Sequence, residues 1–202
     1  MAVIIEKEAK FYIKELKKAK QDVLSLGAVC KQARTFEKNF RFDTQENSLA
    51  ATHQVLRLRQ DTIARLTYKG PADSNSTVSA RPEYEVKISD LETGQNILEA
   101  LGYQVVTIYE KYRASYMIGD VEISLDEMPF GDFIEIEGPS EKGIQLIAKK
   151  LGFTWEHRSA MSYMRLFNIV KNNMKLSFRD LTFNNFQQIN VFPEHLQLQY
   201  AN

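Results

Sequence analysis

Hydrophobic and polar residues alternate along much of the chain, and this pattern predicts β-strands. In the first such run, over residues 3–13, Glu6, Glu8 and Lys10 occupy every second position, and apolar residues occupy the positions between them. Successive side chains of a strand point to opposite faces, so the three charged side chains share one face. One amphipathic strand is common in antiparallel sheets. Here, however, the charged alternation recurs at least six times.

The same alternation, together with turn residues between the runs, predicts seven further strands. Gly70 and Pro71 end one hairpin, Gly119 forms the turn of another, and Gly138 with Pro139 ends the last strand. The expected strands cover residues 34–42, 54–60, 63–69, 81–88, 103–117, 120–126 and 132–137.

Helical spacing of apolar residues predicts helices over residues 14–32, 93–101, 140–151 and 159–171, with Ser140 as an N-cap. After Met174 the chain is rich in aromatic residues without a clear period, so we expect an irregular segment packed against the body. No repeat or linker divides the chain. The pattern therefore predicts one α+β domain over residues 1–202, an eight-stranded antiparallel β-barrel flanked by helices.

In most of the predicted strands, charged or polar residues recur at every second position, so one face of the strand is polar. This polar face has two interpretations. In an open sheet it would be a solvated face, whereas in a closed sheet it lines a cavity that can hold a small ligand. The signs favour a cavity, because basic residues dominate the middle strands and glutamate pairs occur on the first and last strands. The residues of this parity beyond the first strand are Arg57, Arg59, Thr67, Lys69, Arg81, Glu83, Glu85, Lys87, Lys111, Arg113, Glu122, Ser124, Asp126, Glu135 and Glu137.

Composition narrows the possible partners. The chain has 26 basic and 26 acidic side chains, so it lacks the basic excess typical of nucleic-acid binding. The single cysteine, Cys30, excludes an intrachain disulfide and a cysteine-based zinc site, and we expect it to pack within the first helix. No leader or apolar run of roughly 20 residues is present, which predicts a cytoplasmic protein without a membrane partner.

The charged face has the chemistry of a metal and polyphosphate site. Glu6, Glu8, Glu135 and Glu137 offer the oxygen ligands that Mg²⁺ and Mn²⁺ prefer. Arginine and lysine bind phosphate oxygens, arginine through a planar fork and lysine as a compact charge. The basic candidates for phosphate binding are Lys10, Arg57, Arg59, Lys69, Arg81, Lys87, Lys111 and Arg113.

The order of these motifs resembles one family. Glu6–Lys10 reads Glu-Lys-Glu-Ala-Lys, which is similar to the ExExK motif of the CYTH superfamily, the triphosphate tunnel metalloenzymes. The later elements follow in the family's order over about residues 3–170, and they most resemble the class IV adenylyl cyclase branch. Residues 171–202 are then a C-terminal extension. The elements are Leu56–Arg59, Leu66–Pro71, Arg81–Glu85, Lys111–Arg113, Asp126 and Gly131–Gly138.

The resemblance implies an eight-stranded tunnel and roles for its residues. It implies that Glu6, Glu8, Glu135 and Glu137 hold Mg²⁺ or Mn²⁺, and that the basic residues hold a triphosphate. Lys10, Glu85 and Asp126 are the catalytic candidates.

Three activities remain open from the sequence. The leading hypothesis is cyclisation of ATP to cyclic AMP and pyrophosphate. The second is hydrolysis of a triphosphate, which could be tripolyphosphate, thiamine triphosphate or a nucleotide. The third is binding of such a molecule without catalysis. The expected partner is therefore ATP, tripolyphosphate or another organic triphosphate. A homodimer is possible.

Overall fold

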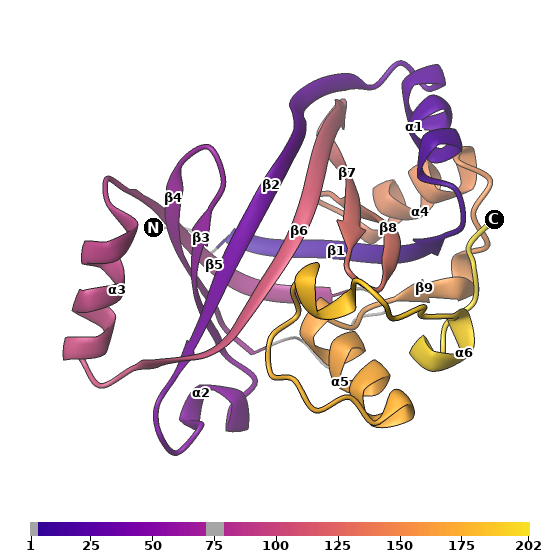
Figure 1. Ribbon diagram of the computed structural model, residues 1–202. Helices are drawn as coiled ribbons and strands as arrows, with labels where there is room; N and C mark the ends of the chain where they lie inside the picture. The colour runs from indigo at the N-terminus through magenta and orange to yellow at the C-terminus, as the bar shows by residue number, and fades with distance from the viewer. Residues whose placement is uncertain (1–3, 72–78) are drawn as a thin grey trace.

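Eight strands of the protein close into an antiparallel barrel (Figure 1). The computed structural model describes residues 4–71 and 79–202, with side chains from Lys7 onward in these ranges. Within them, one sheet has the strand order β5-β4-β3-β2-β6-β7-β8-β1-β9. β5 also pairs with the first half of β1, which closes the ring, and the short β9 pairs with Lys10 and Phe11 in the second half of β1. The predicted barrel flanked by helices is confirmed.

The strands lie close to the predicted ranges. They are β1 (Ile4–Ile13), β2 (Val29–Asp43), β3 (Val55–Gln60), β4 (Ala64–Lys69), β5 (Ser79–Ile88), β6 (Gln104–Ile118), β7 (Val121–Met128), β8 (Gly131–Glu137) and β9 (Arg158–Ser159). The helices are α1 (Leu16–Ser25), α2 (Ser48–Ala51), α3 (Leu91–Ala100), α4 (Glu141–Lys150), α5 (Tyr163–Met174) and α6 (Pro193–Leu196), with 3₁₀ turns η1 (Trp155–His157) and η2 (Asn184–Phe186). None of the described helices is long and apolar enough to cross a membrane.

The predicted helix over residues 14–32 is too long. The helix α1 ends at Ser25, and Gly27 follows with a φ of 80°, a left-handed conformation that glycine adopts readily. β2 then begins at Val29, which pairs with Met117 of β6. The prediction that Cys30 packs within a helix is therefore wrong, because Cys30 lies on β2 and is exposed. Apolar residues of the strand had extended the helical pattern across the glycine.

The helices cover the apolar outer face of the barrel. Phe11 of β1 and Ile134 of β8 belong to one buried cluster with Val23 of α1 and Ile144 of α4. A second cluster joins the outer face of β2 and β3 to Leu98 of α3, on the other side of the barrel (Figure 1). The expected N-cap of α4 is present, since the Ser140 side chain accepts a hydrogen bond from the Gly143 backbone N–H. Because the apolar faces of most strands are buried against the helices outside the barrel, the opposite, polar faces line the interior.

The C-terminal segment fills one end of the barrel. Tyr12 and Phe133 have the same parity as the inward charged residues of their strands, yet they pack in a cluster with Leu166 and Phe167 of α5. Leu181 extends the sheet here, because its backbone N–H donates to Ile108 and its carbonyl accepts from Glu110, both at 2.9 Å. α5 and the following chain lie together at this end in Figure 1. The predicted packing of the irregular segment against the body is confirmed.

This packing makes α5 part of the folded core. We expect Leu166→Ala to lower the free energy of unfolding by about 2–5 kcal/mol, because Leu166 is fully buried and its truncation leaves a cavity. Urea unfolding followed by circular dichroism measures the change. Leu146→Ala on α4 is the control, since Leu146 is 53% exposed. Equal effects of the two substitutions would show that α5 contributes little to the core.

Candidate active site

The inner face of the barrel carries buried charged side chains from five of its eight strands, β1, β2, β6, β7 and β8. Every described barrel strand contributes at least one polar side chain to it, in the alternation that the sequence predicts. The most deeply buried of these residues are Lys10, Glu37, Asn39, Thr67, Lys111, Ser115, Ser124, Asp126 and Glu135.

Lys10 lies between carboxylates of two neighbouring strands. Its Nζ donates a short hydrogen bond to Glu8 Oε1 and is 3.2 Å from Glu135 Oε2. The register places Lys10 opposite Glu135 and Glu8 opposite Glu137. Burial alone would lower the pKa of Lys10, but Glu135 and Glu8 raise it above its ordinary value. Lys10 is therefore a permanent cation inside the barrel.

Asp126 accepts hydrogen bonds from three side chains. Arg113 approaches both of its oxygens, at 2.6 Å through Nε and 2.5 Å through Nη2. Lys111 Nζ lies at 3.1 Å and the Tyr163 hydroxyl at 2.7 Å. Burial would raise the pKa of Asp126, but Arg113 and Lys111 hold it below its usual range. Asp126 is thus an ionised anchor for the basic groups around it.

Glu135 joins the two groups of charges. Its carboxylate lies between Lys10 on β1 and Arg113 on β6, with Arg113 Nη2 at 3.0 Å. Burial would raise the pKa of Glu135, but Lys10, Arg113 and Lys111 keep it well below its ordinary value. The ionised network is therefore continuous from β1 to β6.

Tyr163 connects this network to the C-terminal segment. It is the first residue of α5, and its ring centroid lies 5.4 Å from Lys10 Nζ and 5.3 Å from Lys111 Nζ. Burial and the nearby Asp126 raise the pKa of Tyr163 well above its ordinary value, so its hydroxyl stays protonated and donates. The sequence predicted a helix here but held no signal that its first residue would reach into the barrel.

Arginines crowd the wall formed by β2 and β3. Arg41 and Arg57 are cross-strand partners, and Arg59 follows two residues after Arg57. Burial and the charge of Arg57 lower the pKa of both Arg41 and Arg59. Arg57 donates to the Tyr109 hydroxyl at 3.0 Å. An anion bound beside this wall would relieve the repulsion among its cations.

Towards β4 and β5 the charges become more exposed. Glu85 is 34% exposed and lies 3.3 Å from Arg59 Nη2. Lys69 lies 3.2 Å from Glu83 Oε2. Thus Arg59, Lys69 and Glu85 line the barrel as predicted.

Two predicted basic residues have different surroundings. Arg81 donates to the carbonyls of Gly70 and His53, which fixes its guanidinium at the ends of the neighbouring strands. Lys87 is exposed on β5, beyond Glu85. Their predicted contact with substrate remains a prediction.

The predicted metal ligands fit a hard cation in their chemistry. Glu137 is opposite Glu8 on one side and Glu122 on the other. Opposed carboxylates repel each other, and their oxygens suit Mg²⁺ or Mn²⁺. In the described part of the chain, no three His, Cys, Asp or Glu side chains gather as a ready metal site. The Glu6 side chain lies outside that part, although its backbone is opposite Arg81. The metal assignment remains a prediction.

Sequence reasoning missed the inward face of β2. Glu37 lies 3.6 Å from Lys111 Nζ and 4.0 Å from Arg59 Nη1, and Asn39 is fully buried. These residues alternate with Phe36, Phe40 and Phe42 along the strand. The alternation along this strand would have predicted them, because Glu37 and Asn39 lie at the positions between the phenylalanines.

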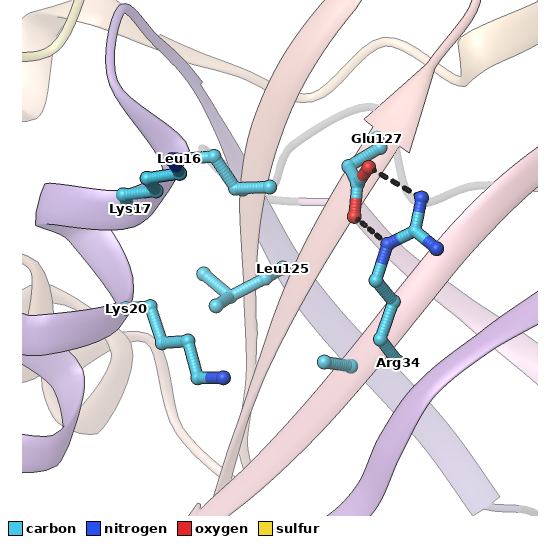
Figure 2. Close-up of a pocket in the computed structure, with 7 residues that line it drawn as sticks. Leu16, Lys17, Lys20, Arg34, Leu125 and Glu127 are labelled. Carbon is cyan, nitrogen blue, oxygen red and sulfur yellow. Dashed lines mark hydrogen bonds and ion pairs between the residues drawn. The ribbon is translucent and has the colours of Figure 1, made fainter.

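A separate pocket lies outside the barrel, between α1 and the outer wall. It has a volume of about 380 Å³ including space open to solvent, and Leu125 lies between Lys20 and Arg34 in Figure 2. Arg34 makes two hydrogen bonds to Glu127, at 2.6 and 2.8 Å, so its charge is already paired. The pocket contains none of the inward charged residues, and we assign no substrate to it.

The chain belongs to the CYTH domain family. The family model matches residues 5–152, which include all eight barrel strands. A relative from Methanocaldococcus jannaschii, named "Putative adenylate cyclase MJ0240", is 31% identical over 173 residues, covering 85% of this chain and 94% of the relative. The predicted family is therefore confirmed, and it agrees with an enzyme that processes triphosphates.

Solved structures share the fold. A Vibrio parahaemolyticus protein described as a "putative adenylate cyclase" has a TM-score of 0.74 at 21% identity and covers 83% of this chain and 99% of its own. The Hippeastrum protein HpAC1, described as a "putative adenylyl cyclase" with a dominant triphosphatase activity, has a TM-score of 0.62 at 20% identity and covers 81% of this chain and 94% of its own.

The buried network predicts a pH-dependent effect of removing Arg113. At pH 7, Arg113→Met should lower the free energy of unfolding by about 3–5 kcal/mol, because it leaves two buried carboxylates with fewer partners. The depressed pKa values of Asp126 and Glu135 contribute stability above the unfolded-state pKa values, and this contribution is lost as the pH falls through the folded-state values. The difference from the unsubstituted protein should therefore shrink below about pH 4.

Urea unfolding at pH 7 and at lower pH measures this difference. Arg179→Met is the matched control, since Arg179 is 60% exposed in its ion pair with Asp180 and should contribute at most about 1 kcal/mol. A deficit in Arg113→Met that stays constant with pH would contradict the ionised network.

Proposed function

We propose that this protein is a divalent-metal-dependent enzyme that binds a triphosphate inside the barrel and cleaves one of its phosphoanhydride bonds. The observation that carries the proposal is the wall of Arg41, Arg57 and Arg59, which lies across the barrel from the carboxylates of β1 and β8. The side chains of Arg57 and Arg59 are only 12% and 14% exposed. A polyphosphate chain suits the basic wall, and a divalent cation suits the carboxylates.

The chain's own residues would hold and orient the substrate. Arg57 and Arg59 would donate to phosphate oxygens, and Lys69, Lys111 and Arg113 would add positive charge around them. Glu8, Glu135 and Glu137 would hold Mg²⁺ or Mn²⁺, with Glu6 as a further proposed ligand. When bound, the metal would stabilise negative charge that develops on the phosphate oxygens. Since such catalysis is mostly positioning and charge stabilisation, a rigid charged barrel is suited to it.

The protonation states assign different roles to the catalytic candidates. Lys10 would act as a fixed cation, because its raised pKa prevents it from accepting a proton at neutral pH. Asp126 would position Lys111 and Arg113, since its oxygens already accept from both. Glu85, at the exposed side, would orient Arg59.

Cyclisation of ATP is the first candidate reaction. The ribose 3′-oxygen would attack the α-phosphorus and lose its proton, and the bond from the α-phosphorus to the bridging oxygen would break to release pyrophosphate. The relationship to the protein named as an adenylate cyclase supports this candidate.

Hydrolysis of a triphosphate is the second candidate. Water would attack a terminal phosphorus and lose a proton, and a diphosphate and orthophosphate would leave. The low exposure of Arg57 and Arg59 favours it, because cationic groups inside the barrel would bind phosphate oxygens whichever organic group remains outside. The triphosphatase activity described for the Hippeastrum protein, which shares the fold, is compatible with this reaction.

One assay separates these candidates. Purified protein with Mg²⁺ or Mn²⁺ is incubated separately with ATP, tripolyphosphate and thiamine triphosphate, and the products are separated by ion-exchange chromatography. Cyclic AMP with pyrophosphate supports cyclisation, whereas orthophosphate without cyclic AMP supports hydrolysis. Binding without any turnover would leave a noncatalytic triphosphate-binding protein and contradict the enzymatic proposal.

The carboxylate wall is tested by Glu137→Gln. We expect turnover to fall by at least about 100-fold with little change in thermal stability, because a lost metal ligand weakens metal binding without removing apolar burial. Glu46→Gln in the exposed loop before α2 is the control and should keep full activity. Unchanged turnover in Glu137→Gln would remove this residue from the site.

A further inference from the structure

Buried polar atoms without hydrogen-bond partners gather on the β2–β3 wall. They are Glu37 Oε2, both amide atoms of Asn39, and the Nε atoms of Arg57 and Arg59. Among the described residues, only Gln32 Nε2 shares this property elsewhere. Glu37 Oε2 and Arg59 Nε each have one longer ion-pair contact, at 3.6 Å, to Lys111 Nζ and Asp61 Oδ2 respectively. Buried polar groups in folded proteins are nearly always paired, so a cluster of five on one wall needs an explanation.

The cluster faces the interior of the barrel. Asn39 is directly opposite Arg59 on β3 and Tyr109 on β6. Its neighbours in sequence on the same face, Glu37 and Arg41, interact with inward charges, whereas Phe42 packs outward in the cluster that contains Leu98 of α3. The Asn39 side chain therefore belongs to the charged cavity and not to the apolar core.

This part of the wall is also the deepest. The exposed fraction falls from 34% at the Glu85 side chain to 14% at Arg59 and 1% at Glu37, and Asn39 is fully buried. Beyond it, Tyr109 packs in the cluster that fills the end of the barrel. A linear triphosphate that enters from the Glu85 side would reach this depth with its terminal phosphoryl group.

The atoms of the cluster match one state of that group. Asn39 Nδ2 and the two arginine Nε atoms donate, whereas Asn39 Oδ1 and Glu37 Oε2 accept. A fully ionised phosphoryl group offers only acceptors. A phosphoryl group that retains one proton offers both, and the last proton of a phosphate monoester leaves near pH 6.

We infer that Asn39, together with Glu37, Arg57 and Arg59, forms a subsite for a terminal phosphoryl group that carries a proton. This inference rests on the proposed function and adds to it the part of the substrate that is recognised. The subsite selects linear polyphosphates and organic triphosphates over phosphate chains without a free end. Asn39 is the specificity-determining residue, because its amide alone supplies both a donor and an acceptor.

We expect Asn39→Leu to leave the stability of the free protein unchanged or higher and to lower its affinity for tripolyphosphate. Leucine has a similar shape and removes two unpaired buried polar atoms, so the thermal unfolding temperature without ligand should stay equal or rise. The affinity for tripolyphosphate should fall by roughly 10- to 100-fold, the range expected for lost hydrogen bonds to a charged group. A purely structural asparagine would change both quantities in the same direction.

The experiment compares two probes by isothermal titration calorimetry without divalent metal. Tripolyphosphate has terminal phosphoryl groups, whereas cyclic trimetaphosphate has none. The unsubstituted protein should prefer tripolyphosphate, and Asn39→Leu should lose most of that preference. Gln32→Leu is the matched control, since it removes the other unpaired amide of β2 and should keep the preference.

Other results would contradict either the subsite alone or the proposed function as well. Tripolyphosphate binding by Asn39→Leu within about twofold of the unsubstituted protein, or an equal loss for both probes, overturns the subsite while the proposed function stands. Failure of the unsubstituted protein to bind tripolyphosphate, with or without Mg²⁺, overturns the proposed function and the subsite together. Should Asn39→Leu fail to fold, Asn39→Ser is judged by the same criteria.

Discussion

The closure of the sheet by pairing of β1 with β5 is the constraint on which the rest of the structure depends. It turns one face of every barrel strand away from bulk water, so each charge on that face needs a partner within the barrel. Desolvated charges are costly unless they are paired and hydrogen-bonded. The ion pairs that link Lys10, Glu135, Arg113 and Asp126 meet this requirement and fix the side chains in place.

The inward charges are not equally well paired in all parts of the barrel. Around Asp126 three side chains donate to one carboxylate. On the β2–β3 wall, in contrast, Arg41 and Arg59 lie beside Arg57, and the amide atoms of Asn39 have no hydrogen-bond partner. The C-terminal segment closes the adjacent end, and Tyr163 ties it to the paired charges. One part of the barrel wall is thus fully paired and another is not, and this difference is the basis of the proposed anion site.

Much of this arrangement could be predicted from the sequence because a strand has a period of two. The period placed Glu8, Lys10 and Glu135 on the inner face without knowledge of the fold. It failed near Gly27, where apolar residues of helix and strand run together, and this error misplaced Cys30. The position of Tyr163 depends on how α5 docks, which no local pattern encodes. Asn39 was available from parity, but its missing partners appear only after the barrel closes.

A crystal structure with tripolyphosphate and Mn²⁺ tests the central claim most directly, because anomalous scattering locates the metal independently of the anion. The account predicts Mn²⁺ peaks beside the carboxylates of Glu8, Glu135 and Glu137, and a polyphosphate chain along Arg57 and Arg59. Metal and anion bound outside the barrel, with the inner ion pairs unchanged, would contradict it.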